Sequence, residues 1–321
     1  MTKVAIVGYG NLGKACEKIA VQNKCFELRG IFTRRNPDLL TSPFGTKFYH
    51  QKDMDKFKDE VDVLVLCTGS KNDLVPLALR GVEDFNTVDA FDNHNEMKKY
   101  VSALNKVATS HNHLSIVGAG WDPGLFSLMR CLFEGVTGSN AHTFWGEGVS
   151  QGHSEAVRGI EGVIRAVQYT LPRKDAILLV KEGRGDHLTN YEKHKRVCYV
   201  VADDLADKNA ISMQIINMPD YFQGYETEIH FIDEDEFLKD HCHLNHGGKV
   251  ICSKNINEQF VIELDLKLDS NPDFTAIMLM SYAKCADRLY RKGERGARTI
   301  LDIPVTYLFD DDRLDIIGKY L

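Results

Sequence analysis

The chain has 321 residues, which is enough for two domains of ordinary size. Its 39 basic and 46 acidic side chains leave a net charge of −7, which removes the electrostatic basis for non-specific binding to nucleic acid or anionic lipid and favours a small soluble ligand. No apolar run approaches the roughly 18 residues of a membrane span, and the apolar stretch within residues 1–10 is too short for a signal sequence, so we expect a cytoplasmic protein.

The first third of the chain alternates short β-branched apolar runs with longer stretches in which apolar residues recur at spacings of three and four. This alternation is typical of βαβ units that build a parallel sheet. We therefore expect a doubly wound, Rossmann-type α/β domain over residues 1–120. The expected strands are Lys3–Val7, Phe26–Phe32, Val61–Cys67, Thr87–Asp89 and Leu114–Val117, and the expected helices are Leu12–Gln22, Leu74–Gly81 and Glu96–Ser110.

From residue 121 onward glycine becomes frequent and the strand-like runs alternate in polarity. Period-two alternation indicates strands with one wet face, as in antiparallel sheets. We expect a second, α+β domain over residues 121–294 with a mixed or antiparallel sheet, and a C-terminal segment, about 295–321, that packs back onto the first domain. The expected strands are Arg196–Ala202, Glu226–Ile232 and Phe260–Leu268, and Phe274–Arg291 is expected to be helical.

A glycine-rich segment follows the first expected strand. Residues 8–13 have the spacing G-x-G-x-x-G at the start of the first expected helix. In that context the glycines permit a tight turn and a close approach of the backbone to a pyrophosphate, and the free amides at the helix start face its negative charge. The alternative is a turn that needs glycine for steric reasons alone. The predicted contacts to the dinucleotide are Gly8, Tyr9, Gly10, Asn11, Leu12 and Gly13.

The end of the second expected strand indicates which dinucleotide is bound. An NAD site normally offers an acid there, about 20 residues past the glycine motif, for the ribose 2′-hydroxyl. In this sequence the strand ends in Thr33, Arg34 and Arg35, with no acid. A hydroxyl and two guanidinium groups can bind a 2′-phosphate, which a carboxylate would repel. The sequence therefore predicts NADP, and the alternative is that the two arginines form a solvated turn.

Two acidic segments follow later strands of the same domain. Residues 89–94 read Asp-Ala-Phe-Asp-Asn-His, and residues 118–124 read Gly-Ala-Gly-Trp-Asp-Pro-Gly. Ligands of open parallel sheets bind beyond the carboxyl ends of the strands, so both segments are expected to face the nicotinamide. The structural alternatives are an Asx turn at Asp92-Asn93 and a helix N-cap at Asp122, which precedes a proline.

These segments belong to a larger set of motifs. The later ones are His-Thr-Phe-Trp-Gly at 142–146, Ser-Gln-Gly-His-Ser at 150–154, Gln-Tyr-Thr-Leu-Pro at 168–172, His-Lys-Arg at 194–196, Met-Pro-Asp-Tyr-Phe at 218–222, His-Gly-Gly at 246–248 and Asn-Pro-Asp-Phe at 271–274. Together they resemble the bacterial meso-diaminopimelate D-dehydrogenases over nearly the whole chain. The resemblance implies an NADP-linked oxidative deamination of meso-2,6-diaminopimelate at its D-centre. The products are L-2-amino-6-oxopimelate, ammonia and NADPH, and the reaction is reversible.

The resemblance also implies roles for individual residues. Asp92 and Asp122 are the expected catalytic groups, because the substrate ammonium must lose a proton before hydride can leave the carbon. Trp121 and Trp145, the two tryptophans of the chain, are expected to form the walls of the substrate site. Arg196 is the expected clamp for the distal carboxylate. Further substrate contacts are expected at Gln151, Gly152, Thr170, His246 and Asn271, and further cofactor contacts at Cys67, Thr68, Gly69 and Ser70.

The resemblance further implies that residues 121–294 bind the substrate and carry the contacts of a homodimer, and that the enzyme serves lysine and cell-wall precursor metabolism. Two other functions stay open: a dehydrogenase or reductase of another amino acid or imine on the same scaffold, and an NADP-binding sensor without turnover.

The cysteines and one histidine cluster raise the question of metal binding. Eight scattered cysteines with no C-x-x-C pair are predicted to be reduced and mostly buried. Residues 241–246 read His-Cys-His-Leu-Asn-His, which is rich in side chains that bind zinc. No second cysteine pair or distant H-x-H accompanies them, so we expect no metal site.

Overall fold

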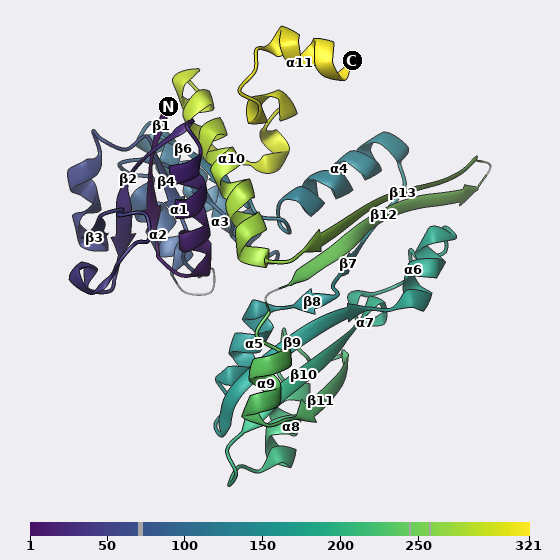
Figure 1. Ribbon diagram of the computed structural model, residues 1–321. Helices are drawn as coiled ribbons and strands as arrows, with labels where there is room; N and C mark the ends of the chain where they lie inside the picture. Colours follow the sequence, from purple (N-terminus) through teal and green to yellow (C-terminus); the bar gives the residue numbers. More distant parts are fainter. Residues whose placement is uncertain (70–72, 244, 257) are drawn as a thin grey trace. The chain divides into compact units, whose positions relative to one another are not determined.

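The computed structural model describes residues 1–69, 73–243, 245–256 and 258–321 of the chain (Figure 1). It divides into two compact units. The first comprises Met1–Leu128 together with Pro272–Leu321, and the second comprises Met129–Asn271. In the sequence, the second unit is therefore inserted between two parts of the first.

The first unit is built on a parallel sheet. Its strands are β1 (Thr2–Val7), β2 (Phe26–Thr33), β3 (Phe48–His50), β4 (Val63–Leu66), β5 (Asn86–Asp89), β6 (Leu114–Val117) and β14 (Gly296–Thr299). Their order in the sheet is β14-β6-β5-β4-β1-β2-β3, and neighbouring strands run parallel. The order reverses between β1 and β4, the point at which doubly wound sheets bind their ligands. The predicted Rossmann-type fold class is confirmed.

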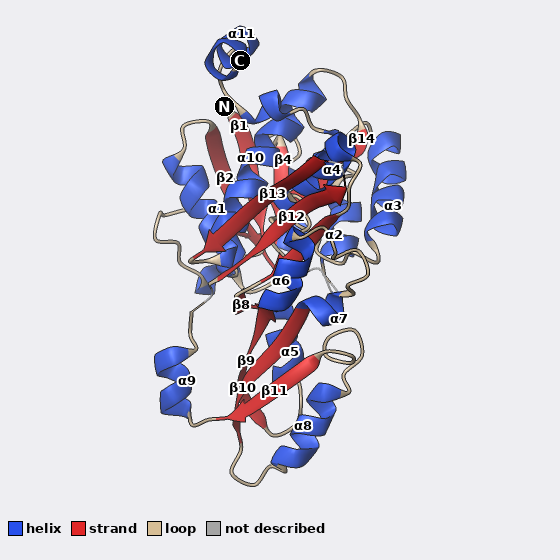
Figure 2. Cartoon of the chain, turned by 90° about the vertical axis from the view of Figure 1, so that its right-hand side faces the viewer, coloured by secondary structure: helices blue, strands red, loops and turns tan. Residues whose placement is uncertain are grey.

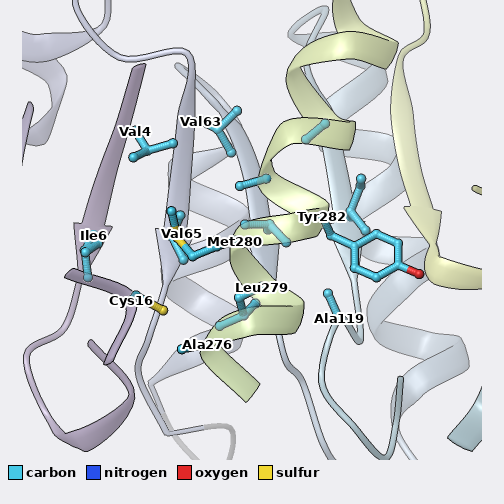
Figure 3. Packing of buried hydrophobic residues seen from close by; sticks show 14 of the residues in the cluster. Val4, Ile6, Cys16, Val63, Val65, Ala119, Ala276, Leu279, Met280 and Tyr282 are labelled. Carbon is cyan, nitrogen blue, oxygen red and sulfur yellow. The ribbon is translucent and has the colours of Figure 1, made fainter. Parts of the chain in front are cut away.

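Helices cover both faces of this sheet because the side chains of its strands alternate between the faces. Val4 and Ile6 of β1 pack with α1 (Asn11–Gln22) and α10 (Asn271–Arg291). Ala5 and Val7 pack on the opposite face with α2 (Leu74–Gly81) and α3 (Met97–Ser110). Figure 3 shows the first of these faces, where Ala276, Leu279 and Met280 of α10 lie against Val63 and Val65 of the sheet.

The remaining elements of the first unit are short. They are η1 (Pro37–Leu39), η2 (Gln51–Phe57), η3 (Ile300–Asp302), η4 (Val305–Leu308) and α11 (Arg313–Tyr320). In the described part of the chain, no helix has both the length and the apolar character needed to cross a bilayer.

The boundaries of the units differ from those expected. The sequence placed them near residues 120 and 294, whereas the structure places them after Leu128 and after Asn271. The difference at the C-terminal side arises from α10, whose apolar stripe completes the core of the parallel sheet. Helical periodicity identifies the stripe but does not say which sheet it covers. Beyond α10, β14 pairs with β6 at the edge of the sheet.

The second unit contains two smaller sheets (Figure 2). The first sheet has the order β11-β10-β9-β8, formed by β11 (Glu226–Phe231), β10 (His194–Ala202), β9 (Val163–Pro172) and β8 (Gly148–Val149). It is mixed, because β10 pairs with β11 parallel and with β9 antiparallel. The second sheet is antiparallel and has the order β13-β12-β7, formed by β13 (Glu258–Leu268), β12 (His246–Ile256) and β7 (Ala141–Trp145). The predicted mixed or antiparallel character is confirmed.

Helices also pack on the four-stranded sheet of the second unit. Cys198 and Val200 of β10 lie in one cluster with apolar residues of α5 (Gln151–Arg158) and α8 (Lys208–Ile216). Phe237 of α9 (Glu234–Asp240) packs with Val167 and Val201 in a separate cluster. The other helices are α4 (Leu125–Thr137), which starts in the first unit, α6 (Lys174–Lys181) and α7 (Asn190–Lys193).

Candidate active site

The glycine turn joins β1 to α1, as the sequence predicts. Gly10 occupies the N-cap position without a side-chain cap, and the first turn of α1 contains no acidic residue. A Cβ added to Gly13 would lie 2.1 Å from the carbonyl oxygen of Gly8, so the tight turn requires glycine at this position. The helix start therefore presents backbone N–H groups to an anion without a competing carboxylate in that turn.

A cavity of about 520 Å³ lies in the first unit beside the end of β4 and the start of α2. Its lining includes Arg34, Thr68 and Asp73. The buried Oγ1 of Thr68 has no hydrogen-bond partner within the described residues. A cavity with an unsatisfied hydroxyl and a guanidinium group fits the phosphorylated ribose of a dinucleotide.

The predicted cofactor residues after β2 and β4 are placed as follows. Thr33 and Cys67 are buried, Thr68 is half-buried, and Arg34, Arg35 and Gly69 are exposed. Ser70 lies outside the described residues. A second cavity, of about 450 Å³, is lined by Phe26, Arg29 and Lys47 among others and contains none of the predicted site residues.

The structure adds an acid that the sequence did not reveal. Asp73, at the N-cap position of α2, accepts hydrogen bonds from both terminal nitrogens of Arg34, at 2.8 and 2.7 Å. Arg35 instead donates to the carbonyl oxygen of Tyr9 at 2.6 Å, and its backbone N–H donates to Thr33 Oγ1 at 3.1 Å. This pair occupies both terminal nitrogens of Arg34, so binding of a 2′-phosphate by this fork requires Asp73 to release them. Asp73 lies 39 residues after Arg34, so the residues that follow β2 do not reveal this pairing.

The two candidate catalytic carboxylates lie in the loops after β5 and β6. Asp92 is exposed, and Asp122 is half-buried. Trp121 is 8% exposed and makes an edge-on contact with Phe126, with ring centroids 5.2 Å apart. A backbone hydrogen bond of 2.8 Å from Ala119 to the carbonyl oxygen of Asp89 ties the two loops together at their bases.

The structure can be compared with the two structural interpretations of these segments, the helix N-cap and the Asx turn. The N-cap interpretation of Asp122 is wrong, because α4 begins at Leu125 and residues 121–124 form a turn before it. The Asx turn in the Asp92-Asn93 segment is confirmed: Asn93 Oδ1 accepts from the backbone N–H groups of Asn95 and Glu96, at 3.1 and 3.3 Å.

In the second unit, strand pairing brings three of the predicted substrate residues together. Thr170 of β9 is the register partner of Arg196 on β10 and of Gly148 on β8. His246 lies beside β8, where a Cβ on Gly148 would be 2.3 Å from the Cα of His246. Thr170, Arg196 and His246 are all buried. Residues far apart in the sequence thus form one polar cluster inside the unit.

The guanidinium of Arg196 is the charged group of this cluster. It donates through Nη1 to Thr170 Oγ1, and its carbon lies 4.1 Å from the ring centroid of Tyr225, a cation–π contact. The buried Nε–H has no hydrogen-bond partner in the described part of the chain. Burial lowers the pKa of Arg196 from its usual value, but a guanidinium stays charged in proteins. A buried cation with an unsatisfied donor is suited to an incoming carboxylate.

The histidines around Arg196 are neutral at physiological pH. Burial, followed by the charge of Arg196, lowers the pKa of His153 to about 3. Burial is also the main reason that the pKa of His246 falls to about 4, and Arg196 contributes in the same direction. These rings can therefore offer one donor and one acceptor each without adding positive charge.

The other predicted substrate residues of the second unit are placed as follows. Trp145 is half-buried at the end of β7, where its ring stacks on His194 with centroids 5.2 Å apart. Its backbone N–H donates to His194 Nε2 at 2.8 Å. Gln151 and Gly152 are exposed at the start of α5. Asn271 is half-buried and is the last residue of the unit.

Gln168 is a further polar side chain of this cluster, and it was not among the predicted substrate contacts. Its side chain is fully buried on β9, where Nε2 donates to Thr170 Oγ1 at 3.3 Å. Its Oε1 has no hydrogen-bond partner among the residues described. In the sequence, Gln168 is the first residue of the Gln-Tyr-Thr-Leu-Pro motif, which does not distinguish a ligand contact from a structural bond.

For metal binding, the described residues contain no group of three or more histidine, cysteine or acidic side chains arranged to hold an ion. Leu244, within the histidine-rich segment, lies outside those residues.

The parallel sheet with its glycine turn, together with a second unit that contains a buried guanidinium cluster, defines a two-domain dinucleotide-dependent oxidoreductase. The chain is 46% identical over 305 residues to the meso-diaminopimelate D-dehydrogenase of Lysinibacillus sphaericus, with 94% of each chain covered. It belongs to the meso-diaminopimelate D-dehydrogenase family. Residues 120–270 match the family model described as the diaminopimelic acid dehydrogenase C-terminal domain.

Solved structures give the same result. The diaminopimelate dehydrogenase of Corynebacterium glutamicum in complex with diaminopimelate has a TM-score of 0.94 at 42% identity, with 100% of this chain and 99% of that chain covered. An engineered D-amino acid dehydrogenase bound to NADP⁺ has a TM-score of 0.91 at 40% identity and the same coverage. The fold and the family assignment therefore agree.

Proposed function

We propose that this protein oxidises meso-2,6-diaminopimelate at its D-configured carbon, with NADP⁺ as the hydride acceptor. In the overall reaction the ammonium compound, NADP⁺ and water give L-2-amino-6-oxopimelate, ammonium, NADPH and one proton. The observation that carries the proposal is Arg196, a buried guanidinium whose Nε–H lacks a partner among the described residues. The relatives of this chain are named for diaminopimelate. The distal carboxylate of that molecule is the partner that such a guanidinium requires.

The unreactive L-end of the substrate is bound by the second unit. Arg196 holds its carboxylate, and Thr170 and His246 add uncharged hydrogen-bonding groups. Asn271 and Gln151 contact the same molecule through their amides. Because the reacting carbon lies at the other end, these contacts orient the substrate without taking part in bond changes.

The D-end is bound by the two loops of the first unit. Asp92 and Asp122 hold the ammonium group, remove a proton from it and stabilise the positive charge that grows as hydride leaves the carbon. Trp121 and Trp145 exclude water and restrict which C–H bond can face the cofactor.

NADP fits the residues of the first unit. When bound, its nicotinamide supplies the hydride acceptor. The glycine turn and the start of α1 would hold the pyrophosphate, and Thr33, Arg34 and Arg35 would hold the 2′-phosphate. The unsatisfied Thr68 hydroxyl in the adjoining cavity, with Cys67 and Gly69 beside it, supports the same placement.

A direct assay tests the proposed function. The purified protein with NADP⁺ and meso-diaminopimelate is expected to produce NADPH, followed by its absorbance, and an equal amount of ammonia. The all-L isomer, which lacks a D-centre, is the matched control and is expected to be nearly inert. Turnover of other D-amino acids but not of meso-diaminopimelate would favour the broader dehydrogenase. Tight NADP binding without turnover of any amino acid would favour the sensor.

Removing the positive charge after β2 is expected to change cofactor preference. Replacing Arg34 and Arg35 together by alanine should weaken NADP binding by at least about 10-fold, the magnitude of losing a hydrogen bond between charged groups. NAD binding, measured by the same fluorescence titration, should change by less than about 3-fold because NAD lacks the 2′-phosphate. Arg29→Ala, on β2 itself, removes one positive charge away from the predicted cofactor residues and is the control. Equal losses for both cofactors would instead make the two arginines structural.

We also propose a homodimer in the cytoplasm, acting in lysine and cell-wall precursor metabolism. One observation that supports dimerisation is α4, on which Leu132 is 50% and Val136 is 76% exposed although the helix is largely apolar. All eight cysteines are free thiols, which suits a reducing compartment.

A further inference from the structure

Asp89 is a buried carboxylate to which the proposed mechanism gives no role. It ends β5, is 0% exposed, and accepts a hydrogen bond from the hydroxyl of Tyr100 on α3 at 2.7 Å. Its other oxygen accepts from the backbone N–H of Phe91 at 3.0 Å and lies 3.5 Å from that of Gly118. Burial raises the pKa of Asp89 to about 6, while these hydrogen bonds act in the opposite direction.

The partners of Asp89 belong to the two loops that carry the candidate catalytic residues. Phe91 directly precedes Asp92, and Gly118 and Ala119 begin the segment that leads to Trp121 and Asp122. Ala119 also donates to the backbone oxygen of Asp89 at 2.8 Å. One residue therefore connects the loop after β5 with the loop after β6 through both its backbone and its side chain.

The location of these bonds matters because β5 and β6 have little other connection at their carboxyl ends. Their register pairs are Thr87 with Ser115 and Val88 with Ile116, and none is formed by Asp89 itself. Beyond these register pairs, a backbone hydrogen bond runs from Ala119 to Asp89, and the side chain of Asp89 adds to it. Beyond the end of the sheet, the carboxylate of Asp89 faces the backbone N–H groups of Phe91 and Gly118, one in each loop.

We propose that Asp89, held by Tyr100, is a positioning residue that sets the spacing of the Asp92 and Asp122 loops for the deamination reaction. This inference rests on the proposed function for its kinetic consequence. The carboxylate acts on the reaction only through the loops: it is buried in the first unit and does not exchange a proton with the substrate. A displacement of catalytic groups by about 1 Å can cost about 100-fold in rate, so loosening the loops should be visible in kcat.

The phenyl ring of Tyr100 contributes a second restraint. Its centroid lies 4.4 Å from that of Phe91, so the residue packs against the loop as well as binding the carboxylate. Tyr100→Phe removes the hydroxyl and keeps this ring contact. Asp89→Asn keeps one oxygen for the loop N–H groups, whereas Asp89→Ala removes every side-chain bond. The three variants thus separate the bond between the carboxylate and Tyr100 from the bonds between the carboxylate and the loop N–H groups.

The kinetic experiment compares these variants in the NADP-dependent deamination assay. Asp89→Ala is expected to lower kcat by about 10- to 100-fold, with KM for the substrate and the Kd of NADP each changing by less than about 3-fold. Asp89→Asn and Tyr100→Phe are expected to lower kcat by less than Asp89→Ala does. Of these two variants, the one that keeps more of the hydrogen bonds of residue 89 should keep the higher kcat. If the alanine variant does not fold, the other two decide the question, because each preserves most of the packing.

Thr87→Val is the matched control. Thr87 lies two residues before Asp89 and donates to Ser115 at 2.7 Å across the same pair of strands, in a buried environment. Its loss should lower the melting temperature and leave kcat unchanged. If Thr87→Val reduces kcat as much as the Asp89 variants do, or if the Asp89 and Tyr100 variants keep the wild-type kcat, the positioning role is wrong.

A second readout does not depend on turnover. In a Trp145→Phe background Trp121 is the sole tryptophan, and it is 8% exposed in the loop after β6. Acrylamide quenching of its fluorescence is expected to rise at least about 2-fold with Asp89→Ala and Tyr100→Phe, and to stay unchanged with Thr87→Val. Unchanged quenching in all variants would overturn the positioning role even if the protein acts on another substrate. If quenching increases but the protein does not consume meso-diaminopimelate, the result would support the role of Asp89 in holding the loops and would reject the proposed function.

Discussion

Replacing Asp122 or Asp92 by asparagine is expected to lower kcat for oxidative deamination by about 10²- to 10⁴-fold, the usual contribution of a general acid or base. Asparagine has nearly the same shape as aspartate but cannot take a proton from the ammonium or balance the charge that develops as hydride leaves. The measurement is NADPH formation at saturating substrate, made with each single variant and with the double variant. The single variant with the larger loss identifies the carboxylate that accepts the proton.

Binding measurements separate this effect from a structural one. Both aspartates lie in loops beyond the sheet, so the Kd of NADP and the melting temperature should stay close to those of the wild type. Asp59→Asn, at an exposed position of the same unit, is the control and should be fully active. Because the substrate amine must lose a proton first, the wild type is expected to react faster at alkaline pH. Full activity of the Asp92 and Asp122 double variant would exclude both residues from the chemistry.

Replacing Arg196 by alanine is expected to raise KM for meso-diaminopimelate by about 30-fold or more. Removing one partner of a buried, hydrogen-bonded charge pair costs about 2–5 kcal/mol, and every 1.4 kcal/mol corresponds to a factor of ten. Arg196→Lys should recover part of the loss, since it restores the charge without the planar fork. The effect should nearly vanish for a D-amino acid that lacks the distal carboxylate, because that substrate has nothing for the fork to bind.

The neighbouring strand position provides the control for Arg196. Lys195 points to the opposite face of β10 and pairs with Glu228 at 3.0 Å, so Lys195→Ala should leave KM unchanged. Histidine NMR gives an independent check, because the positive charge of Arg196 contributes to the low pKa values of His153 and His246. Both pKa values should rise in Arg196→Ala. An unchanged KM for the natural substrate would show that the clamp lies elsewhere.

Local patterns in the sequence were sufficient for the strands β1, β2, β4, β5 and β6 of the first unit. Alternation of β-branched runs with amphipathic stretches predicts a doubly wound sheet, since each strand is buried on both faces and each helix on one. The glycine spacing between β1 and α1 predicts the anion-binding turn, because the geometry depends on residues adjacent in the chain. The expected strands Arg196–Ala202, Glu226–Ile232 and Phe260–Leu268 correspond to β10, β11 and β13 to within a few residues.

The long-range features were not accessible to that reasoning. The residues next to Arg34 in the sequence do not indicate that it pairs with Asp73. The sequence of α10 likewise does not indicate that this helix completes the core of the parallel sheet and does not belong to the second unit. Strand order and register place Thr170 beside Arg196 and His246 near Gly148. The resemblance to the family supplied these residues as a set, but their physical relationship depends on which strands pair.

The sequence by itself determined the fold class, the phosphate-binding turn and the residue types available for chemistry, because periodicity, glycine spacing and charge are local properties of a chain. Only the tertiary structure decided that Arg196 is buried with an unsatisfied Nε–H and that Asp89 joins two loops. It also decided that residues 272–291 close the core of the first unit. Burial and hydrogen-bond satisfaction depend on partners distant in sequence, and packing selects those partners.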